Sequence, residues 1–569
     1  MLVLTLLTLL IATPLYSSNV SALQQVRLTA VALMFAAYLA LNCYYPATLS
    51  GGVSLYSGLF IADAVTPIAD AFICLSASLA LMPWPVIFNA VKSPIIVTGP
   101  GMKIKRTGYT TSMSHNVHSN SITEYAMLAL FSATGSLLLL SASNVVSLYL
   151  SIELQSFAVY VLASSYRNNE AATAAGLKYF LLGALSSALI LMGTALLYKH
   201  TGLTDLQAIA NLLAVSSPED SIFNNVMLSF VLMGVGMLFK LGAAPFHHWA
   251  PDVYNSVPTI VTTWLAVMPK LAVFMMLLSL CLILAGITTG SDLANMQAAI
   301  NAWQLLLLLS AVMSLVVGTV LGLAQRYVKR LLAYSTVSHV GFMLVALACV
   351  CYSNTGVDAV NAMLFYLAQY TLTAIASFFV LLGLGYVLKG QPSTVQYAQR
   401  GDASDITLIS MLAGHANTQP MLALSMLVCL FSMAGVPPMV GFFAKYNVLY
   451  VAMLNGHHAI ALLGVVTSVI SAAYYLRIVR VLYFDHIITS DDSSVPGSEN
   501  FSYPLPNSTS LTSHGVESTA VANSNVSLSI SSLHSYSIAC LTMFMLLFML
   551  QPAIMLNSTQ LLAMTLYTG

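Results

Sequence analysis

Apolar runs of roughly 20 residues recur along the whole chain, and they limit the folds that it can adopt. An α-helix needs about 20 apolar residues to cross the ~30 Å hydrocarbon core of a bilayer. Only 6% of the residues are charged, against about 25% in soluble domains, so the chain lacks the polar groups to cover a surface in water. The alternation typical of a membrane β-barrel is absent from the sequence. The sequence therefore predicts an all-α polytopic membrane protein.

The apolar runs predict about 14 transmembrane helices, joined mostly by short connections. They lie near 1–17, 26–45, 66–90, 123–141, 144–165, 175–198, 224–249, 258–287, 302–323, 331–351, 359–388, 421–450, 458–483 and 534–555. The first run resembles a signal peptide but lacks the basic residues that precede the apolar part of one. It is therefore interpreted as a first membrane helix.

Polar segments divide the chain. Segment 92–122 holds a small basic cluster, 389–420 is a mixed connection, and 485–533 is rich in Ser, Asn and Pro, which is typical of a loop or disordered segment. The predicted organisation is N-terminal helices with a polar loop (1–122), a first helix repeat (123–287), a second helix repeat (288–483), a loop (484–533) and a C-terminal helix (534–569).

Several functions are disfavoured by composition. The formal net charge is zero, so nothing suggests a nucleic-acid partner. The seven cysteines lie in or beside apolar segments at spacings that match neither a zinc nor an iron–sulfur pattern. No G-x-G-x-x-G follows a strand, so no dinucleotide site is predicted. We therefore expect no cofactor and no metal on this chain, and any redox cofactors on other chains.

Among the charged residues within the predicted spans, five are candidates for function, and each costs about 2.5 to 3.5 kcal/mol on insertion scales. They are Glu153, Lys178, Lys240, Lys270 and Lys445. Such charges are tolerable when they face the bundle interior, pair with one another or contact water. A neighbouring carboxylate stabilises the protonated amine and burial stabilises the neutral one, so these groups suit a proton relay. The alternative is a structural role; for Lys178, near a span end, it is an extension of the side chain to the interface.

Histidines add candidate relay members. His247 and His248 follow Pro245, and one of the two is predicted to relay protons near neutral pH while the other caps the helix end. His339 lies within a span and is either a relay member or a buried polar group with satisfied hydrogen bonds. Arg477 and Arg480 end a span and are interpreted as interfacial anchors.

Two apolar runs are interrupted by proline. Pro245 follows Lys240, and Pro437 and Pro438 precede Lys445. Proline removes a backbone donor and leaves carbonyl groups that need partners, which inside a membrane are other helices, side chains or water. Broken helices in corresponding halves of a chain indicate a transport site.

Four stretches resemble the NADH dehydrogenase subunit 2 family, the antiporter-like membrane subunits of respiratory complex I. They begin at residues 147, 234, 325 and 431 with SLYLSIELQSFAVY, GVGMLFKLGAAPFHHW, QRYVKRLLAYSTVSHV and FSMAGVPPMVGFFAKYN. The resemblance covers about residues 124–483, and RNNEAATAAGLKYF looks most like the mitochondrial form of plants and algae. It implies fourteen helices with two inverted five-helix repeats, each containing one discontinuous helix.

The resemblance also implies roles for individual residues. Glu153 matches the family's fifth-helix glutamate, which pairs with a pumping lysine at Lys240. Lys270 matches the lysine that connects the two halves, and Lys445 the lysine of the second broken helix. Lys178 and His247 match further positions of the family. His248 stands where the family commonly has a non-basic residue, and segments 92–122 and 485–533 look longer than usual, which leaves their roles open.

The implied function is proton translocation in complex I, driven by electron transfer in other subunits that use NADH, FMN, iron–sulfur clusters and ubiquinone. The implied partners are other complex I subunits, especially neighbouring antiporter-like and small membrane subunits, and membrane lipids. The implied location is the mitochondrial inner membrane, with the bacterial plasma membrane as the alternative. Two other functions stay open: a subunit of a multi-subunit sodium/proton antiporter, and a non-pumping structural membrane subunit.

Overall fold

The structure is a computed structural model that describes residues 1–15, 22–45, 49, 52–83, 111–166, 169–215, 221–286, 293–350, 355–389, 405–485 and 531–568. In this part of the chain ten helices are long and apolar enough to cross a membrane, and six shorter apolar helices accompany them. The prediction of a multi-pass helical membrane protein is therefore confirmed. The basic cluster of segment 92–122 and nearly all of 485–533 lie outside the described residues.

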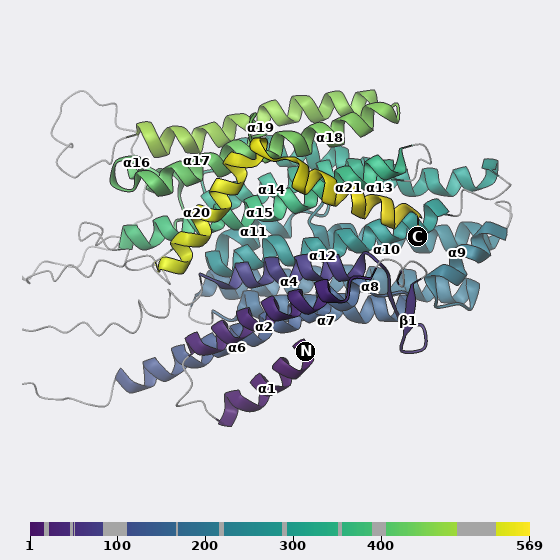
Figure 1. The fold of residues 1–569 in the computed structure, drawn as a ribbon, viewed down its shortest axis with the longest axis horizontal. Coiled ribbons are helices and arrows are strands. Elements are labelled where there is room, and N and C mark those ends of the chain that lie inside the picture. The colour runs from purple at the N-terminus through teal and green to yellow at the C-terminus, as the bar shows by residue number, and fades with distance from the viewer. Residues whose placement is uncertain are drawn as a thin grey trace, which may run out of the picture.

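The helices run along the long axis of the molecule (Figure 1). In chain order they are α1 (Leu2–Leu15), α2 (Ala22–Asn42), α4 (Thr66–Leu81), α6 (Thr111–Leu140), α7 (Val145–Ser164), α8 (Glu170–Thr201), α9 (Leu206–Val215), α10 (Ser221–Leu241), α11 (Trp249–Ser256), α12 (Thr259–Gly286), α13 (Leu293–Leu323), α14 (Val328–Cys349), α15 (Gly356–Lys389), α16 (His415–Thr418), α17 (Pro420–Ala434), α18 (Val440–Leu454), α19 (His458–Phe484), α20 (Ser532–Leu547) and α21 (Ala553–Thr568), with 3-10 turns η3 (Ile409–Leu412) and η5 (Phe548–Leu550).

Three details differ from the sequence prediction. A short antiparallel hairpin, β1 (Val53–Leu55) and β2 (Phe60–Ala62), precedes α4. Its six residues are too few to give a clear alternation pattern. Helix α6 begins at Thr111 and thus extends into the segment expected to be a polar loop. The expected C-terminal helix is two helices, α20 and α21, separated by η5 and a turn near Pro552, because proline cannot donate the backbone hydrogen bond that continues a helix.

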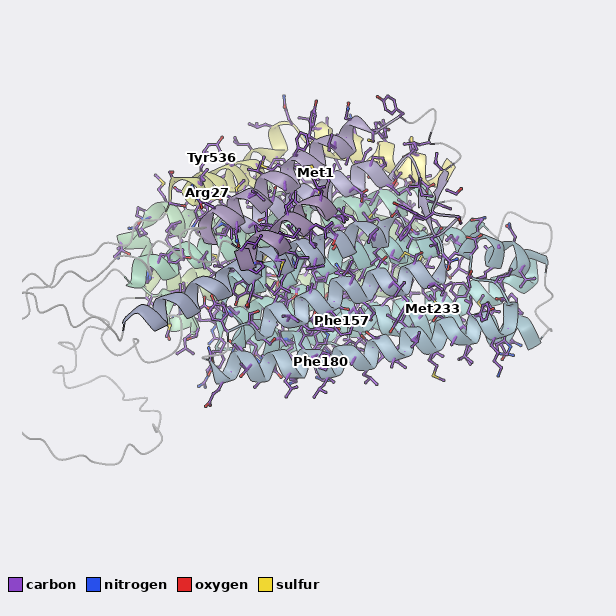
Figure 2. All side chains as sticks on the ribbon, turned by 90° about the horizontal axis from the view of Figure 1, so that it is seen from below. Met1, Arg27, Phe157, Phe180, Met233 and Tyr536 are labelled. Atoms are coloured by element: carbon purple, nitrogen blue, oxygen red, sulfur yellow. The ribbon has the colours of Figure 1, made fainter. Side chains whose placement is uncertain are left out.

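The centre of the bundle is formed by α14, whose side chains are buried over nearly its whole length, and by its neighbours α12 and α15. Outer helices present apolar faces. Phe157 of α7 and Phe180 of α8 are about half exposed and lie near one another on one outer face (Figure 2). Large exposed apolar surface is unfavourable in water, so these faces suit contact with lipid or with other membrane chains.

The same local connection occurs twice. Before α7, Val145 N–H donates to Thr204 O at 2.9 Å and Leu206 N–H donates to Ser143 O at 3.0 Å. Before α14, Val328 N–H donates to Thr407 O at 2.9 Å and Ile409 N–H donates to Arg326 O at 3.0 Å. The connecting helices that follow, α9 and α16, lie at opposite ends of the bundle (Figure 1).

Candidate functional site

The strongest candidate site is a buried ion pair between α7 and α10. Lys240 Nζ lies 3.4 Å from Glu153 Oε1 and donates to Ser156 Oγ at 3.1 Å and Ser187 Oγ at 3.3 Å. Both charged residues are only 9% exposed. The predicted pairing is therefore present, and the two hydroxyl groups complete the environment of the ammonium, as a buried charge requires.

The position of Lys240 follows from the end of α10. Gly242 has a φ of +72°, and Ala243 N–H donates to Leu238 O at 3.0 Å, the geometry of a glycine-terminated helix. Residues 244–248, which include Pro245, form turns, and α11 begins at Trp249. Ala244 N–H is satisfied by Ser314 Oγ of α13 at 2.8 Å. Pro245 thus lies in the predicted helix break, and Lys240 lies one turn before it.

A small cavity adjoins the ion pair. Its volume is about 20 Å³, and Gln155, Ser156, Tyr160 and Lys240 are among its lining residues. A cavity of ~10–15 Å³ holds one water molecule when polar partners are present. The pair therefore has room for about one water molecule beside it.

His247 lies in the break and is 4% exposed. Neither of its ring nitrogens has a hydrogen-bond partner among the described residues. Its ring contacts His248, with centroids 4.4 Å apart, and Tyr334 of α14, at 6.2 Å. A buried imidazole without partners suits a site that water completes. His247 lies close to Lys240 in the sequence, and no direct hydrogen bond joins the two side chains.

Lys270 occupies the middle of α12, next to Pro269, and is 2% exposed. Its Nζ donates to Tyr370 OH at 3.3 Å and lies 5.4 Å from the ring centroid of Tyr254. No carboxylate among the described residues forms an ion pair with it. Aromatic faces and a phenol therefore replace a counter-ion here, and cation–π contacts favour the protonated amine only modestly.

His339 of α14 has a partner on each ring nitrogen. Nδ1 lies 2.7 Å from Tyr366 OH of α15 and Nε2 lies 3.3 Å from Tyr475 OH of α19. Tyr475 OH also bonds Ser335 Oγ. A cavity of about 10 Å³ is lined by His339 and by Tyr370, the partner of Lys270. Both ring nitrogens of His339 thus have hydrogen-bond partners, which fits the prediction of a buried polar group with satisfied hydrogen bonds. The relay role of His339 stays a prediction.

Replacing Tyr366 by phenylalanine is expected to destabilise the protein by about 1–3 kcal/mol, because it leaves a buried imidazole nitrogen unpaired. The thermal midpoint of the detergent-solubilised protein measures this change. Tyr446→Phe is the matched control, because Tyr446 is 55% exposed. Equal midpoints for the two variants would show that the Tyr366 bond adds nothing to stability.

Lys445 of α18 contacts the second break. Its Nζ donates to Ala434 O, the last residue of α17, at 2.8 Å, and lies 5.5 Å from the ring centroid of Phe342. Gly435, with a φ of +86°, ends α17, and Pro437 and Pro438 fall between α17 and α18. A cation at the carbonyl end of a helix is favourable because the helix dipole is negative there. The predicted second broken helix is therefore present.

Lys178 differs from the other lysines. Its side chain is 43% exposed and pairs with Asp252 of α11, which also pairs with Arg330 of α14 at 2.7 Å. The relay role predicted for Lys178 therefore stays a prediction. The sequence reasoning missed Asp252 and Arg330. The sequence offers one signal for Asp252: an acidic residue that follows Pro251, a few residues after the predicted break at Pro245.

The bundle, the two broken helices and the buried Glu153–Lys240 pair define an antiporter-like membrane subunit. Residues 142–471 match the family described as NADH:quinone oxidoreductase/Mrp antiporter, transmembrane, and the chain belongs to this family. Within it, the NADH-ubiquinone oxidoreductase chain 2 of Rhizopus oryzae is 41% identical over 568 residues, 99% of this chain and 98% of that protein. The resemblance to NADH dehydrogenase subunit 2 is thus confirmed; the plant or algal form stays a prediction.

Further similar proteins are consistent with membership of this family. The NADH-quinone oxidoreductase subunit N of Paramagnetospirillum magneticum is 40% identical over 65% of this chain and 70% of that protein. A chain in the structure of respiratory complex I from Thermus thermophilus with bound aureothin matches 98% of this chain and 99% of its own length, at 25% identity and a TM-score of 0.64. A chain of the Mrp complex from Dietzia covers 100% of this chain and 96% of its own length, with a TM-score of 0.71 and 18% identity, and shares the fold alone.

Proposed function

We propose that this chain is a proton-translocating core membrane subunit of respiratory complex I, the NADH:ubiquinone oxidoreductase. The buried Glu153–Lys240 ion pair beside the α10 break carries the proposal. A charge pair this deep in an apolar bundle is expensive to maintain, and such intramembrane pairs mark ion or proton pathways. The full-length similarity to a fungal NADH-ubiquinone oxidoreductase chain supports membership of that enzyme complex.

In this proposal the fold contains two inverted five-helix repeats, α6 to α12 and α13 to α19, with α9 and α16 as connectors. Three observations support it: each set has one interrupted span, each has the same backbone connection, and α9 and α16 lie at opposite ends of the bundle. Five crossings are an odd number, so a second set that follows the first begins on the opposite side of the membrane. The domain boundaries at 123, 288 and 483 rest on the same argument.

The relay runs from the Glu153–Lys240 pair through His247 to Lys270, and from there through His339 to Lys445. A proton transfer needs donors and acceptors within hydrogen-bond reach or joined by one water. The direct bonds in the described residues reach Tyr370 from Lys270 and the two tyrosines from His339. The intervals between stations are longer, so water bridges them. The cavities beside Lys240 and His339 have the volume for such bridges.

Glu153 and Lys240 perform the first step. The carboxylate at 3.4 Å holds the proton on Lys240, together with the hydroxyl groups of Ser156 and Ser187. Weakening of that contact, driven by electron transfer in other subunits, releases the proton toward the centre of the chain. In this proposal NADH, FMN, iron–sulfur clusters and ubiquinone serve those other subunits. Neighbouring antiporter-like and small membrane subunits and lipids cover its apolar faces in the mitochondrial inner membrane.

Purification in mild detergent tests the proposal. The chain is expected to purify with NADH–ubiquinone reductase activity that complex I inhibitors block. The sodium/proton antiporter is the second candidate, and the shared fold of the Mrp complex favours keeping it. Sodium-driven proton exchange by a chain that purifies without any NADH–ubiquinone activity would replace the proposed function with that one.

A further inference from the structure

The short helix α11 forms ion pairs with charged side chains of α8 and α14. Asp252, in its first turn, uses one carboxylate oxygen for Lys178 of α8 and the other for Arg330 of α14, at 2.7 Å for the arginine. We name Lys178, Asp252 and Arg330 the Asp252 triad. Each side chain is between 35% and 43% exposed, so the triad lies at the rim of the bundle.

The residue before Arg330 holds the other end of α11. Lys329 is 2% exposed, and its Nζ donates to Val257 O at 2.7 Å and to Asp405 Oδ2 at 2.9 Å. Asp405 in turn accepts from Thr259 N–H at 3.2 Å and Thr259 Oγ1 at 2.6 Å. A cation therefore meets the C-terminal carbonyl of α11 and a carboxylate caps the N-terminus of α12, both favourable for the helix dipoles.

Two consecutive residues of α14 thus contact α11 at its first turn and at the carbonyl of Val257, the residue that caps its C-terminus. The described network holds three cations, Lys178, Lys329 and Arg330, and two carboxylates, Asp252 and Asp405. Asp252 is the one shared between two cations. Removal of its charge would leave Lys178 and Arg330 facing each other unscreened, at the junction of α8, α11 and α14.

The elements that meet at the Asp252 triad carry relay groups. Helix α11 directly follows the break that holds His247, Lys240 lies at the end of α10 before that break, and α14 carries His339 at its centre. Tyr334, one turn after Arg330, contacts the ring of His247. Because α14 is buried over nearly its whole length and packs closely, a shift of its first turn is transmitted along it rather than absorbed.

We propose that Asp252 is a positioning residue that couples the Lys240 site of the first repeat to the His339 helix of the second repeat. It does so by fixing α11 between Lys178 and Arg330. The inference rests on the proposed function. Arg330 is the member that crosses between the repeats, whereas Lys178 and Asp252 both belong to the first.

The test uses the whole complex, with Asp252→Asn in this chain, and measures protons pumped per NADH oxidised in vesicles. Lys240→Met gives the full loss of passage through this chain. Asp252→Asn is expected to lower proton passage through this chain about fivefold or more, because coupling between two sites typically changes an equilibrium at least about fivefold. NADH oxidation by the assembled complex is expected to continue. Asp252→Glu, which keeps the carboxylate, is expected to restore much of it.

A purely structural role would change the amount of complex but not the ratio per assembled complex, so this ratio decides the question. Arg330→Gln is the second variant. It leaves Lys178 and Asp252 paired and balanced in charge but removes the link between repeats, and it is expected to lower the ratio like Asp252→Asn. Lys199→Met is the matched control, since Lys199 is an exposed lysine at the far end of α8.

A wild-type ratio in Asp252→Asn or in Arg330→Gln would overturn the coupling role, provided that Lys240→Met lowers it. A wild-type ratio in Lys240→Met itself would instead remove the proposed function. The two failures are therefore distinguishable in one series of variants.

Discussion

Replacing Lys240 by methionine is expected to lower proton passage through this chain by at least about 100-fold, the usual contribution of a positioned acid–base group. Methionine keeps much of the length and apolar stem of lysine but cannot carry a proton. The change also leaves Glu153 buried beside Ser156 without its cation. Loss of one partner of a buried pair typically costs about 3–5 kcal/mol, so the single variant combines lost function with lost stability.

The double variant Lys240→Met with Glu153→Gln separates the two effects. It removes both charges, so no uncompensated ion remains in the bundle. Both variants are measured as protons pumped per NADH oxidised, per assembled complex, with Lys199→Met as the control. We expect the double variant to assemble better than the single one and to pump equally poorly. A wild-type number of protons pumped per NADH in the double variant would contradict the role assigned to this pair and favour a non-pumping structural subunit.

Replacing Gly441 by alanine is expected to destabilise the chain more than any other glycine substitution at a helix break. A Cβ at this position would lie 1.8 Å from Ser432 O and 2.8 Å from Ser432 C, both backbone atoms of α17. Overpacking of a core typically costs about 1–3 kcal/mol and sometimes more, and here no side chain can move to relieve the overlap. Helices α17 and α18 must separate, which stretches the Lys445–Ala434 bond of 2.8 Å.

The measurement is the thermal midpoint and yield of the detergent-solubilised protein. Gly322→Ala is the matched control, because the nearest atom to its added Cβ is 3.1 Å away and belongs to the ring of Tyr474. We expect a small loss for Gly322→Ala and a large one for Gly441→Ala. Similar midpoints for the two variants would mean that the two halves of the second broken span do not pack as closely as the structure has them.

Much of the site could be predicted from single residues and the apolar sequence around them. Glu153 and Lys240 had to find partners because an unpaired charge is too costly inside a bilayer, and the structure pairs them with each other. Pro245 and Pro437 marked the breaks because proline cannot continue the backbone hydrogen bonds of a helix. Both arguments need only the residue and its apolar surroundings, which are visible in the sequence.

The partners of the other charges were not visible in this way. Lys178 pairs with Asp252, 74 positions away, and Arg330 joins the same carboxylate from 78 positions away. The tyrosines that bond His339 come from two further helices. An all-round apolar helix gives no face by which to tell its neighbours, so hydrophobic periodicity cannot choose among them.

The sequence by itself therefore determined a multi-pass helical bundle, the two breaks and the need for a buried pair. Those features depend on the local sequence alone: on the apolar length that spans a bilayer, on the missing N–H donor of proline and on the free energy of desolvating a charge. Only the tertiary structure decided that Arg330 reaches Asp252, that phenols surround His339 and that Lys445 meets the end of α17. Those choices depend on how close-packed helices interdigitate, which distant parts of the chain set together.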